Sequence, residues 1–250
     1  MQAPPGCPPG LEYLTQLDQI LVHQQVDLLE VLTGFDTENK YQIKNALGQQ
    51  VLSFSAQVFF AAEESDPSIR SLCGSSRSFI MHVVDNANQE VIRVHRPLQL
   101  CAGCCWFADL ISHCAHTVRV EAPPGQTIGY VRQRGSKWEP HFDILDASFE
   151  PMLKIRGPGC MFNEICCSDI DFQLMSYDES RQIGKISKQW AGIVKELATN
   201  ADNFGITFPM DLDVKVKATL LGALFLIDFM FFENSTQEPN NSGVPLGPYY

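Results

Sequence analysis

Residues 218–232 are Ala-Thr-Leu-Leu-Gly-Ala-Leu-Phe-Leu-Ile-Asp-Phe-Met-Phe-Phe, and a helix of this sequence is apolar on every face except at Asp228. A helix that is hydrophobic all round is buried either in lipid or in protein. These fifteen residues would extend about 22 Å, which is short of the roughly 30 Å of hydrocarbon in a bilayer. Asp228 at the bilayer centre would add a cost of about 2.5–3.5 kcal/mol. We therefore predict a helix enclosed by protein, with a membrane span as the alternative.

Lengthening this helix toward its N-terminus would include Lys215 and Lys217, which a membrane span could accommodate only by snorkelling. Glycosylation acceptor patterns at Asn234 and Asn240 would matter only if the C-terminus lay outside the cell. The residues that we expect to be buried, or to lie in the membrane in the alternative, are Ala218, Leu221, Leu224, Phe225, Ile227, Asp228 and Phe232.

Between residues 40 and 190 the sequence repeats a hairpin pattern, in which an apolar alternating run, a short turn and a second apolar run follow one another. So many antiparallel strands usually avoid bare edges by closing into a barrel or a sandwich. We therefore predict a mainly β domain that encloses the apolar helix. The five units are Tyr41–Ile43 with Val51, Ile80–Val84 with Val91–Val94, Val118–Ala122 with Ile128–Val131, Phe142–Leu145 with Met152–Ile155, and Phe172–Met175 with Ile183–Ile186.

The amino-acid composition limits the kinds of partner that the protein can bind through its charge. The 250 residues carry a formal net charge of −11, from 18 Lys and Arg against 29 Asp and Glu. Such a balance disfavours charge-driven binding to nucleic acid, or to an anionic bilayer through a broad basic face. The Pro- and Gly-rich start does not resemble a signal peptide. Nine cysteines are then expected in a reducing compartment, where disulfides are uncommon and the cytoplasm is the default.

The pattern along the chain predicts three regions. We expect residues 1–10 to be a short Pro-rich disordered stub and residues 234–250 to be a disordered tail. Residues 11–233 form the folded domain, beginning with a short helix and a strand. No arrangement of nucleophile, base and acid, and no phosphate-cradling loop, stands out within it.

Eight stretches, spread over almost the whole chain, together identify a family. They are Cys-Pro-Pro-Gly-Leu-Glu-Tyr-Leu (7–14), Leu-Asp-Gln-Ile-Leu-Val-His-Gln-Gln (17–25), Asn-Lys-Tyr-Gln-Ile-Lys-Asn (39–45), Ala-Pro-Pro-Gly (122–125), Gly-Lys-Ile-Ser-Lys-Gln-Trp (184–190), Ala-Asp-Asn-Phe-Gly-Ile (201–206), Phe-Pro-Met-Asp-Leu-Asp-Val (208–214) and Phe-Leu-Ile-Asp-Phe-Met-Phe-Phe-Glu (225–233). These stretches resemble the phospholipid scramblase family. The resemblance implies a tubby-like fold, a closed antiparallel barrel of about twelve strands around a hydrophobic C-terminal helix.

The function that the resemblance implies is transport rather than bond chemistry. A membrane-anchored scramblase would mediate calcium-dependent, ATP-independent movement of phospholipids in both directions between leaflets. Its partners would be a phospholipid bilayer and anionic phospholipids, with self-association as a further expectation. It would lie on the cytoplasmic face of the plasma membrane, with the nucleus or a mitochondrial membrane as further compartments. The alternative is a non-translocating lipid-binding adaptor in signalling or transcription, which shuttles between membrane and nucleus.

The family's palmitoylated segment corresponds to Cys101, Cys104 and Cys105, so the resemblance implies covalent palmitate on these thiols. Two or three acyl chains would anchor the protein stably, whereas one binds only marginally. Inert thiols are one alternative. Another is a zinc site that combines Cys101 and Cys104 with His113, Cys114 or His116.

The family's proposed calcium segment corresponds to residues 200–211, with Asn200, Asp202 and Asp211 as the expected ligands. An EF-hand loop requires an oxygen ligand at its fifth position and a bidentate Glu at its twelfth. Here Phe204 and Asp211 occupy those positions, so we expect a weak site. The alternative is a core strand that leads into a capped helix.

Two further segments bear on the resemblance. Lys185 and Lys188 lie in a stretch that the family uses for nuclear import, and a strand ending at a packed Trp190 is the alternative. Leu52–Val58 interrupts the family pattern. We interpret it as a hairpin extension, or as an alternative splice or gene-model insertion.

Overall fold

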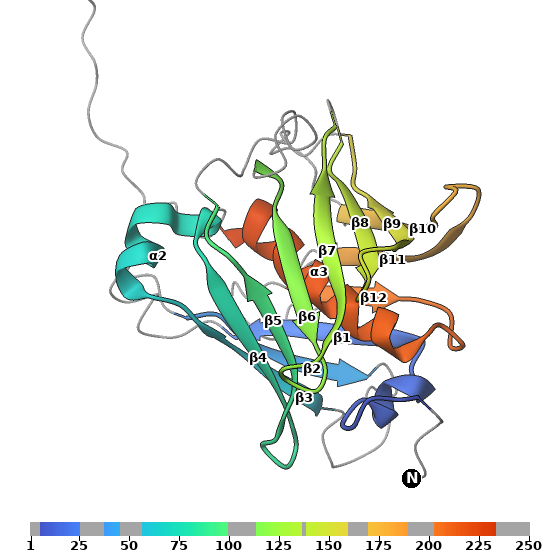
Figure 1. Cartoon of the computed structure of the whole chain (residues 1–250), viewed down its shortest axis with the longest axis horizontal. Coiled ribbons are helices and arrows are strands. Elements are labelled where there is room, and N and C mark those ends of the chain that lie inside the picture. The colour runs from blue at the N-terminus through green and yellow to red at the C-terminus, as the bar shows by residue number, and fades with distance from the viewer. Residues whose placement is uncertain are drawn as a thin grey trace, which may run out of the picture.

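The computed structural model describes residues 6–25, 38–45, 57–99, 114–136, 139–159, 170–189 and 203–233. Twelve antiparallel strands form a closed barrel around one long helix, α3 (Val214–Phe231) (Figure 1). Consecutive strands pair with one another, and β1 closes the barrel by pairing with β12. The predicted fold, a closed barrel around a C-terminal helix, is therefore confirmed, and the sandwich alternative is wrong.

The strands differ little in length. They are β1 (Gln19–Gln25), β2 (Lys40–Asn45), β3 (Gln57–Glu64), β4 (Phe79–Asp85), β5 (Glu90–Arg96), β6 (Thr117–Glu121), β7 (Thr127–Arg134), β8 (His141–Asp146), β9 (Pro151–Arg156), β10 (Ile170–Ser176), β11 (Gln182–Gln189) and β12 (Asn203–Thr207). The other helical elements are the 3-10 helices η1 (Glu12–Gln16) and η3 (Gly74–Ser76) and the α-helix α2 (Pro67–Cys73).

Four tight hairpins, β4–β5, β6–β7, β8–β9 and β10–β11, lie at one end of the barrel, which we call the hairpin end. Aspartates shape two of them in the same way, because their carboxylates accept backbone N–H groups within the turn. Asp85 accepts from Ala87 and Gln89, and Asp146 does so at the corresponding positions of its own turn. The predicted units agree with these hairpins. In the first unit, Val51 lies outside the described residues, and the second strand is described from Gln57.

The hydrogen bonds of two side chains fix the start of α3, near the hairpin end of the barrel. Asp213 caps the helix, since its carboxylate accepts the N–H of Lys215 at 2.7 Å. Lys217 is fully buried and donates from Nζ to the carbonyl oxygens of Leu14, Leu17 and Met210 at 3.1, 2.7 and 2.6 Å. This lysine is therefore a buried link between α3 and η1 and does not snorkel.

The rest of α3 is enclosed by the barrel wall. Small residues permit the close approach, since a Cβ at Gly222 would lie 2.6 Å from Val120 Cγ2 and one at Gly129 would lie 2.7 Å from Thr219 Oγ1. The residues predicted for the buried face are all buried: Ala218, Leu221, Leu224, Phe225, Ile227, Asp228 and Phe232. In the part of the chain that the structure describes, no helix has both the length and the apolar content needed to cross a bilayer.

The chain ends and the insertion lie largely outside the described residues. Within the predicted stub, residues 6–10 are placed against the domain: Pro8 is buried, and the Gly10 N–H donates to Glu12 Oε2 at 2.9 Å. Of the Leu52–Val58 segment, only Gln57 and Val58 are described, and they begin β3. Residues 234–250, the predicted tail, are not among the described residues.

Candidate functional site at one end of the barrel

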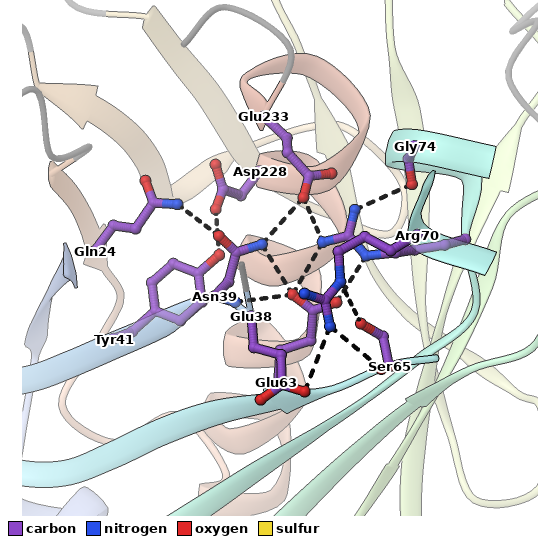
Figure 2. Close-up of polar contacts among 11 residues, drawn as sticks. Gln24, Glu38, Asn39, Tyr41, Glu63, Ser65, Arg70, Gly74, Asp228 and Glu233 are labelled. Atoms are coloured by element: carbon purple, nitrogen blue, oxygen red, sulfur yellow. Dashed lines mark hydrogen bonds and ion pairs between the residues drawn. The ribbon is translucent and has the colours of Figure 1, made fainter. Parts of the chain in front are cut away.

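Polar side chains gather inside the barrel at the end opposite the hairpins, where β2 begins and where β3 and α3 end (Figure 2). Asn39 and Glu233, which are hydrogen-bonded there, lie 194 residues apart in the sequence. We call this group the polar cluster. Its members are Asn39, Tyr41, Glu63, Arg77, Asp228 and Glu233.

Arg77 is the centre of the polar cluster. Its fully buried guanidinium donates to Glu63 in a bidentate pair, from Nε to Oε1 at 2.7 Å and from Nη2 to Oε2 at 2.9 Å. Nη2 also bonds to Glu233, and Nη1 donates to the Gly74 carbonyl at 3.0 Å. The guanidinium carbon lies 4.6 Å from the centroid of the Phe229 ring. One side chain thus ties the end of α3 to β3 and η3.

Burial and ion pairing act in opposite directions on these charges. Burial favours the neutral acid, but the hydrogen bonds and charge of Arg77, together with hydrogen bonds from Ser65 and Asn39, hold the pKa of Glu63 below its ordinary value. At Glu233 burial prevails over the bond from Arg77, and the pKa is raised. Glu63 is therefore the ionised partner of Arg77, and Glu233 takes up a proton more readily.

Tyr41 is a hydrogen-bond partner of Asp228, the acidic residue in the apolar helix. Its hydroxyl donates to Asp228 Oδ2 at 2.6 Å, and both residues are buried. Burial, followed by the charge of Asp228, raises the pKa of Tyr41 well above its ordinary value. The Tyr41 ring also packs on Phe225, with the ring centroids 5.1 Å apart. Asp228 therefore fixes the depth and rotation of α3 against β2.

A second buried cation, Arg96, ends β5 beside His116. Arg96 Nη2 lies 3.0 Å from His116 Nδ1, and within the described residues neither Nε nor Nη1 of Arg96 has a hydrogen-bond partner. Burial lowers the pKa of Arg96 to about 10, so the group keeps its charge at neutral pH. Burial, followed by the charge of Arg96, lowers the pKa of His116 to about 3. A neighbouring guanidinium makes His116 a poor zinc ligand, because it would repel the metal ion.

Cys101, Cys104 and Cys105, predicted to be acylated, lie outside the described residues, as does His113. Cys114 is described and is disulfide-bonded, contrary to the expectation that disulfides are uncommon in this chain. Cys7 and Cys73 are free and half-buried. No group of three or more potential His, Cys, Asp or Glu ligands for a metal is present among the residues that the structure describes.

Of the three predicted calcium ligands, only Asp211 lies among the described residues. Asn200 and Asp202 lie outside the described residues. They precede β12, which pairs on both sides, whereas the exposed Asp211 lies beyond its other end, next to the cap of α3. A strand rises about 3.4 Å per residue, so the five residues of β12 hold the chain that precedes the strand about 14 Å from the chain that follows it. Calcium ligands lie about 2.3–2.6 Å from the ion. In the described part of this stretch, the structure contains β12 followed by the capped start of α3, which is the alternative that the sequence suggested.

The two lysines predicted for nuclear import lie in β11, which pairs with β10 and β12. Lys185 Nζ donates to Asp171 Oδ2 at 2.9 Å, and Lys188 Nζ lies 4.1 Å from the centroid of the Phe232 ring. Both side chains therefore have contacts within the barrel wall, and the strand alternative describes this segment.

Sequence reasoning missed the charged members of the polar cluster. Glu63 is the second-last residue of β3, and Arg77 precedes β4 by two residues. Charged side chains at the ends of strands are usually solvated. A partial signal was present, because Asp228 in an apolar helix requires a buried polar partner. Only the closure of the barrel identifies that partner as Tyr41, 187 residues away.

Removing the Tyr41 hydroxyl tests the tie between β2 and α3. Tyr41→Phe should lower the free energy of unfolding by about 1.5–3 kcal/mol, because the buried Asp228 carboxylate loses the hydrogen bond from Tyr41. Urea unfolding measures this change. Tyr177→Phe, at a residue that is 49% exposed, is the control, and an equal loss in both variants would contradict the assignment.

The buried His116 predicts a dependence of stability on pH. Its pKa in the folded protein, about 3, lies below the ordinary 6.5, so the unfolded chain takes up a proton first as the pH falls. The free energy of unfolding should therefore fall from pH 6.5 toward pH 3, and His116→Gln should flatten part of that slope. Urea unfolding between pH 7 and pH 4 measures it. His82→Gln, which retains His116, should keep the slope, and an unchanged slope in His116→Gln would contradict the prediction.

Comparison with known proteins identifies the family of this chain. A family model described as Scramblase matches residues 1–234. Phospholipid scramblase 1 of Rattus norvegicus is 53% identical over 247 residues, which cover 98% of this chain and 69% of the relative. Phospholipid scramblase 1 of Homo sapiens is 51% identical, covering 97% and 72%, and phospholipid scramblase 2 of Bos taurus is 52% identical, covering 94% and 75%. This chain belongs to the scramblase family.

Proposed function

We propose that this protein is a membrane-anchored phospholipid scramblase, which moves phospholipids in both directions between leaflets, depends on calcium and does not use ATP. The match to the Scramblase model over residues 1–234 is the observation that carries the proposal. Relatives about half identical in sequence are named phospholipid scramblases. The proposed activity is translocation rather than bond chemistry.

The anchor is proposed to be covalent palmitate at Cys101, Cys104 and Cys105. Two observations support an anchor other than α3. The helix is enclosed by the barrel, and Arg77 and Tyr41 tie its end to neighbouring strands. A chain of net charge −11 is also repelled by an anionic leaflet, so it needs acyl chains to remain there. We place the anchored protein on the cytoplasmic face of the plasma membrane, where anionic phospholipids would be among its partners.

Calcium is proposed to act through the segment that precedes β12, with Asp202 as a ligand. Asp211 is separated from that segment by the length of β12 and lies beside Asp213, which caps α3. The chemistry of the segment is consistent with a weak site, because few carboxylates are present in it.

A pair of matched variants tests the proposed activity and its calcium dependence. Asp202→Asn should weaken calcium activation by about tenfold, through loss of one charged ligand, and Asp211→Asn should leave it unchanged. The assay reconstitutes the chain into liposomes that carry a fluorescent lipid, and dithionite quenches the outer leaflet. Calcium is titrated with and without ATP.

Quenching beyond one half of the signal, in calcium and without ATP, is the expected result for the unmodified chain. Quenching that stops at one half, with the protein verified as bound, would refute translocation and favour the lipid-binding adaptor. Loss of activation in Asp211→Asn alone would contradict the assignment of calcium ligands.

The acyl anchor predicts release by thioester cleavage. Hydroxylamine should move most of the protein from cell membranes to the supernatant, because acyl chains rather than α3 hold it there. The Cys101→Ser/Cys104→Ser/Cys105→Ser variant should begin in the supernatant, whereas Cys73→Ser, which removes a half-buried free thiol, should behave as the unmodified chain does. Immunoblotting of the two fractions measures this, and protein that stays in the membrane after hydroxylamine would contradict the anchor.

A further inference from the structure

The outer face of β7, β8 and β9 brings three cations and a histidine together around a cavity that Asp143 and Glu179 also line. Arg134 lies opposite His141 in the pairing of β7 with β8, and His141 lies opposite Arg156 in the pairing of β8 with β9. Lys154 follows on the same face of β9, two residues before Arg156. These four side chains line a cavity of about 120 Å³, which is several times the space that one water molecule requires. We call it the basic cavity.

Cations that face one another on neighbouring strands repel, and three acids offset this repulsion. Arg156 Nε donates to Glu139 at 2.5 Å, Lys154 Nζ donates to Glu179 at 2.5 Å, and Arg134 Nη1 donates to Asp143 at 3.0 Å. Glu139 and Glu179 are 28% and 45% exposed, whereas Asp143 is only 8% exposed. Ion pairs at such exposed positions are weak. Two of the three acids can therefore turn out to solvent and leave their cations to another anion.

The replacement of Glu139 and Glu179 by a bound anion determines the charge that this anion must carry. When Glu139 and Glu179 turn away, Arg156 and Lys154 lose two negative charges, while Arg134 keeps the buried Asp143. A phosphate monoester replaces both charges with one compact group. Its oxygens accept hydrogen bonds from guanidinium and ammonium groups with favourable geometry.

Exposed apolar side chains adjoin the basic cavity on the side toward the hairpin end. Met152 lies on the same face of β9 as Lys154 and is 38% exposed. Tyr177 is 49% exposed, and its ring centroid lies 4.9 Å from Lys154 Nζ. Phe149 is 48% exposed and packs on Tyr130, with the ring centroids 4.3 Å apart. Aromatic side chains with one wet edge are favoured at the surface of a bilayer. If the ligand were a small soluble phosphate, these exposed side chains would have no bilayer surface to contact.

We propose that the basic cavity binds the phosphate monoester of an anionic phospholipid headgroup, with Arg134, Lys154 and Arg156 as donors and with Phe149, Met152 and Tyr177 at the bilayer surface. The proposal rests on the proposed function in one respect, since it places the protein at a membrane. It adds a headgroup class and a binding face on β7–β9 that neither the family nor the lipid movement specifies.

Binding of the full chain to vesicles tests the proposal. The vesicles contain phosphatidylcholine alone, or phosphatidylcholine with phosphatidic acid (a monoester) or phosphatidylserine (a diester), the two anionic mixtures being matched in surface charge. Binding to phosphatidic acid should be about tenfold tighter than binding to phosphatidylserine. Lys154→Gln/Arg156→Gln should abolish that preference.

Arg93→Gln on β5 is the matched control. This arginine is 35% exposed and ion-paired with Glu90 at 2.6 Å, so the variant removes a comparable charge from another face and should keep the preference. Met152→Ser/Tyr177→Ser should weaken binding to all vesicles and should not change binding of glycerol 3-phosphate, because it leaves the cations in place. Thermal unfolding of each variant verifies that it is folded.

Three outcomes would overturn the proposal. One is equal binding of phosphatidic acid by the unmodified chain and by the double variant. Another is equal binding of phosphatidic acid and phosphatidylserine. The third is binding of soluble glycerol 3-phosphate as tight as that of phosphatidic acid vesicles, which would assign the cavity to a free phosphate. Vesicle binding is measured without lipid movement, so failure of this proposal and failure of the scramblase proposal give separate results.

Discussion

The enclosure of α3 is the constraint on which the rest of the structure depends. The helix presents no polar face, and Val216 to Phe229 are buried, so protein must surround it on all sides. A sheet can do so only by closing on itself, which the pairing of β1 with β12 accomplishes. Buried polar side chains then fix the position of the helix, with Lys217 at its start and Arg77 and Tyr41 at its end.

Much of this fold could be predicted from local patterns. The helix is identified by its all-round apolarity and four of the hairpins by alternation around short turns, because both signals lie within about twenty residues. The second strand of the first unit is described from Gln57, and Val51, where the pattern predicted it, lies outside the described residues. The polar cluster could not be predicted, because Arg77 and Glu233 are 156 residues apart and meet only in the closed barrel.

For the candidate sites, too, local sequence patterns and the contacts in the structure differ. A list of carboxylates between residues 200 and 211 suggests one calcium loop, yet a paired strand stands between its two ends. Lys185 and Lys188 suggest a free basic motif, yet both have partners in the barrel wall. The basic cavity shows the opposite case: Arg134, His141 and Arg156 carry no motif in sequence, and the register of three strands alone aligns them.

The most direct test of the account asks whether α3 stays enclosed while lipid moves. A Cβ placed on Gly222 lies 2.6 Å from Val120 Cγ2, so a Val120→Cys/Gly222→Cys variant, in which the two sulfur atoms replace that methyl contact, would form a disulfide that locks the helix to β6. Lipid movement is measured in liposomes by dithionite quenching, with the same variant oxidised and reduced. The account predicts equal rates in the two forms. Movement in the reduced form that stops on oxidation would show that α3 must leave the barrel, and would contradict it.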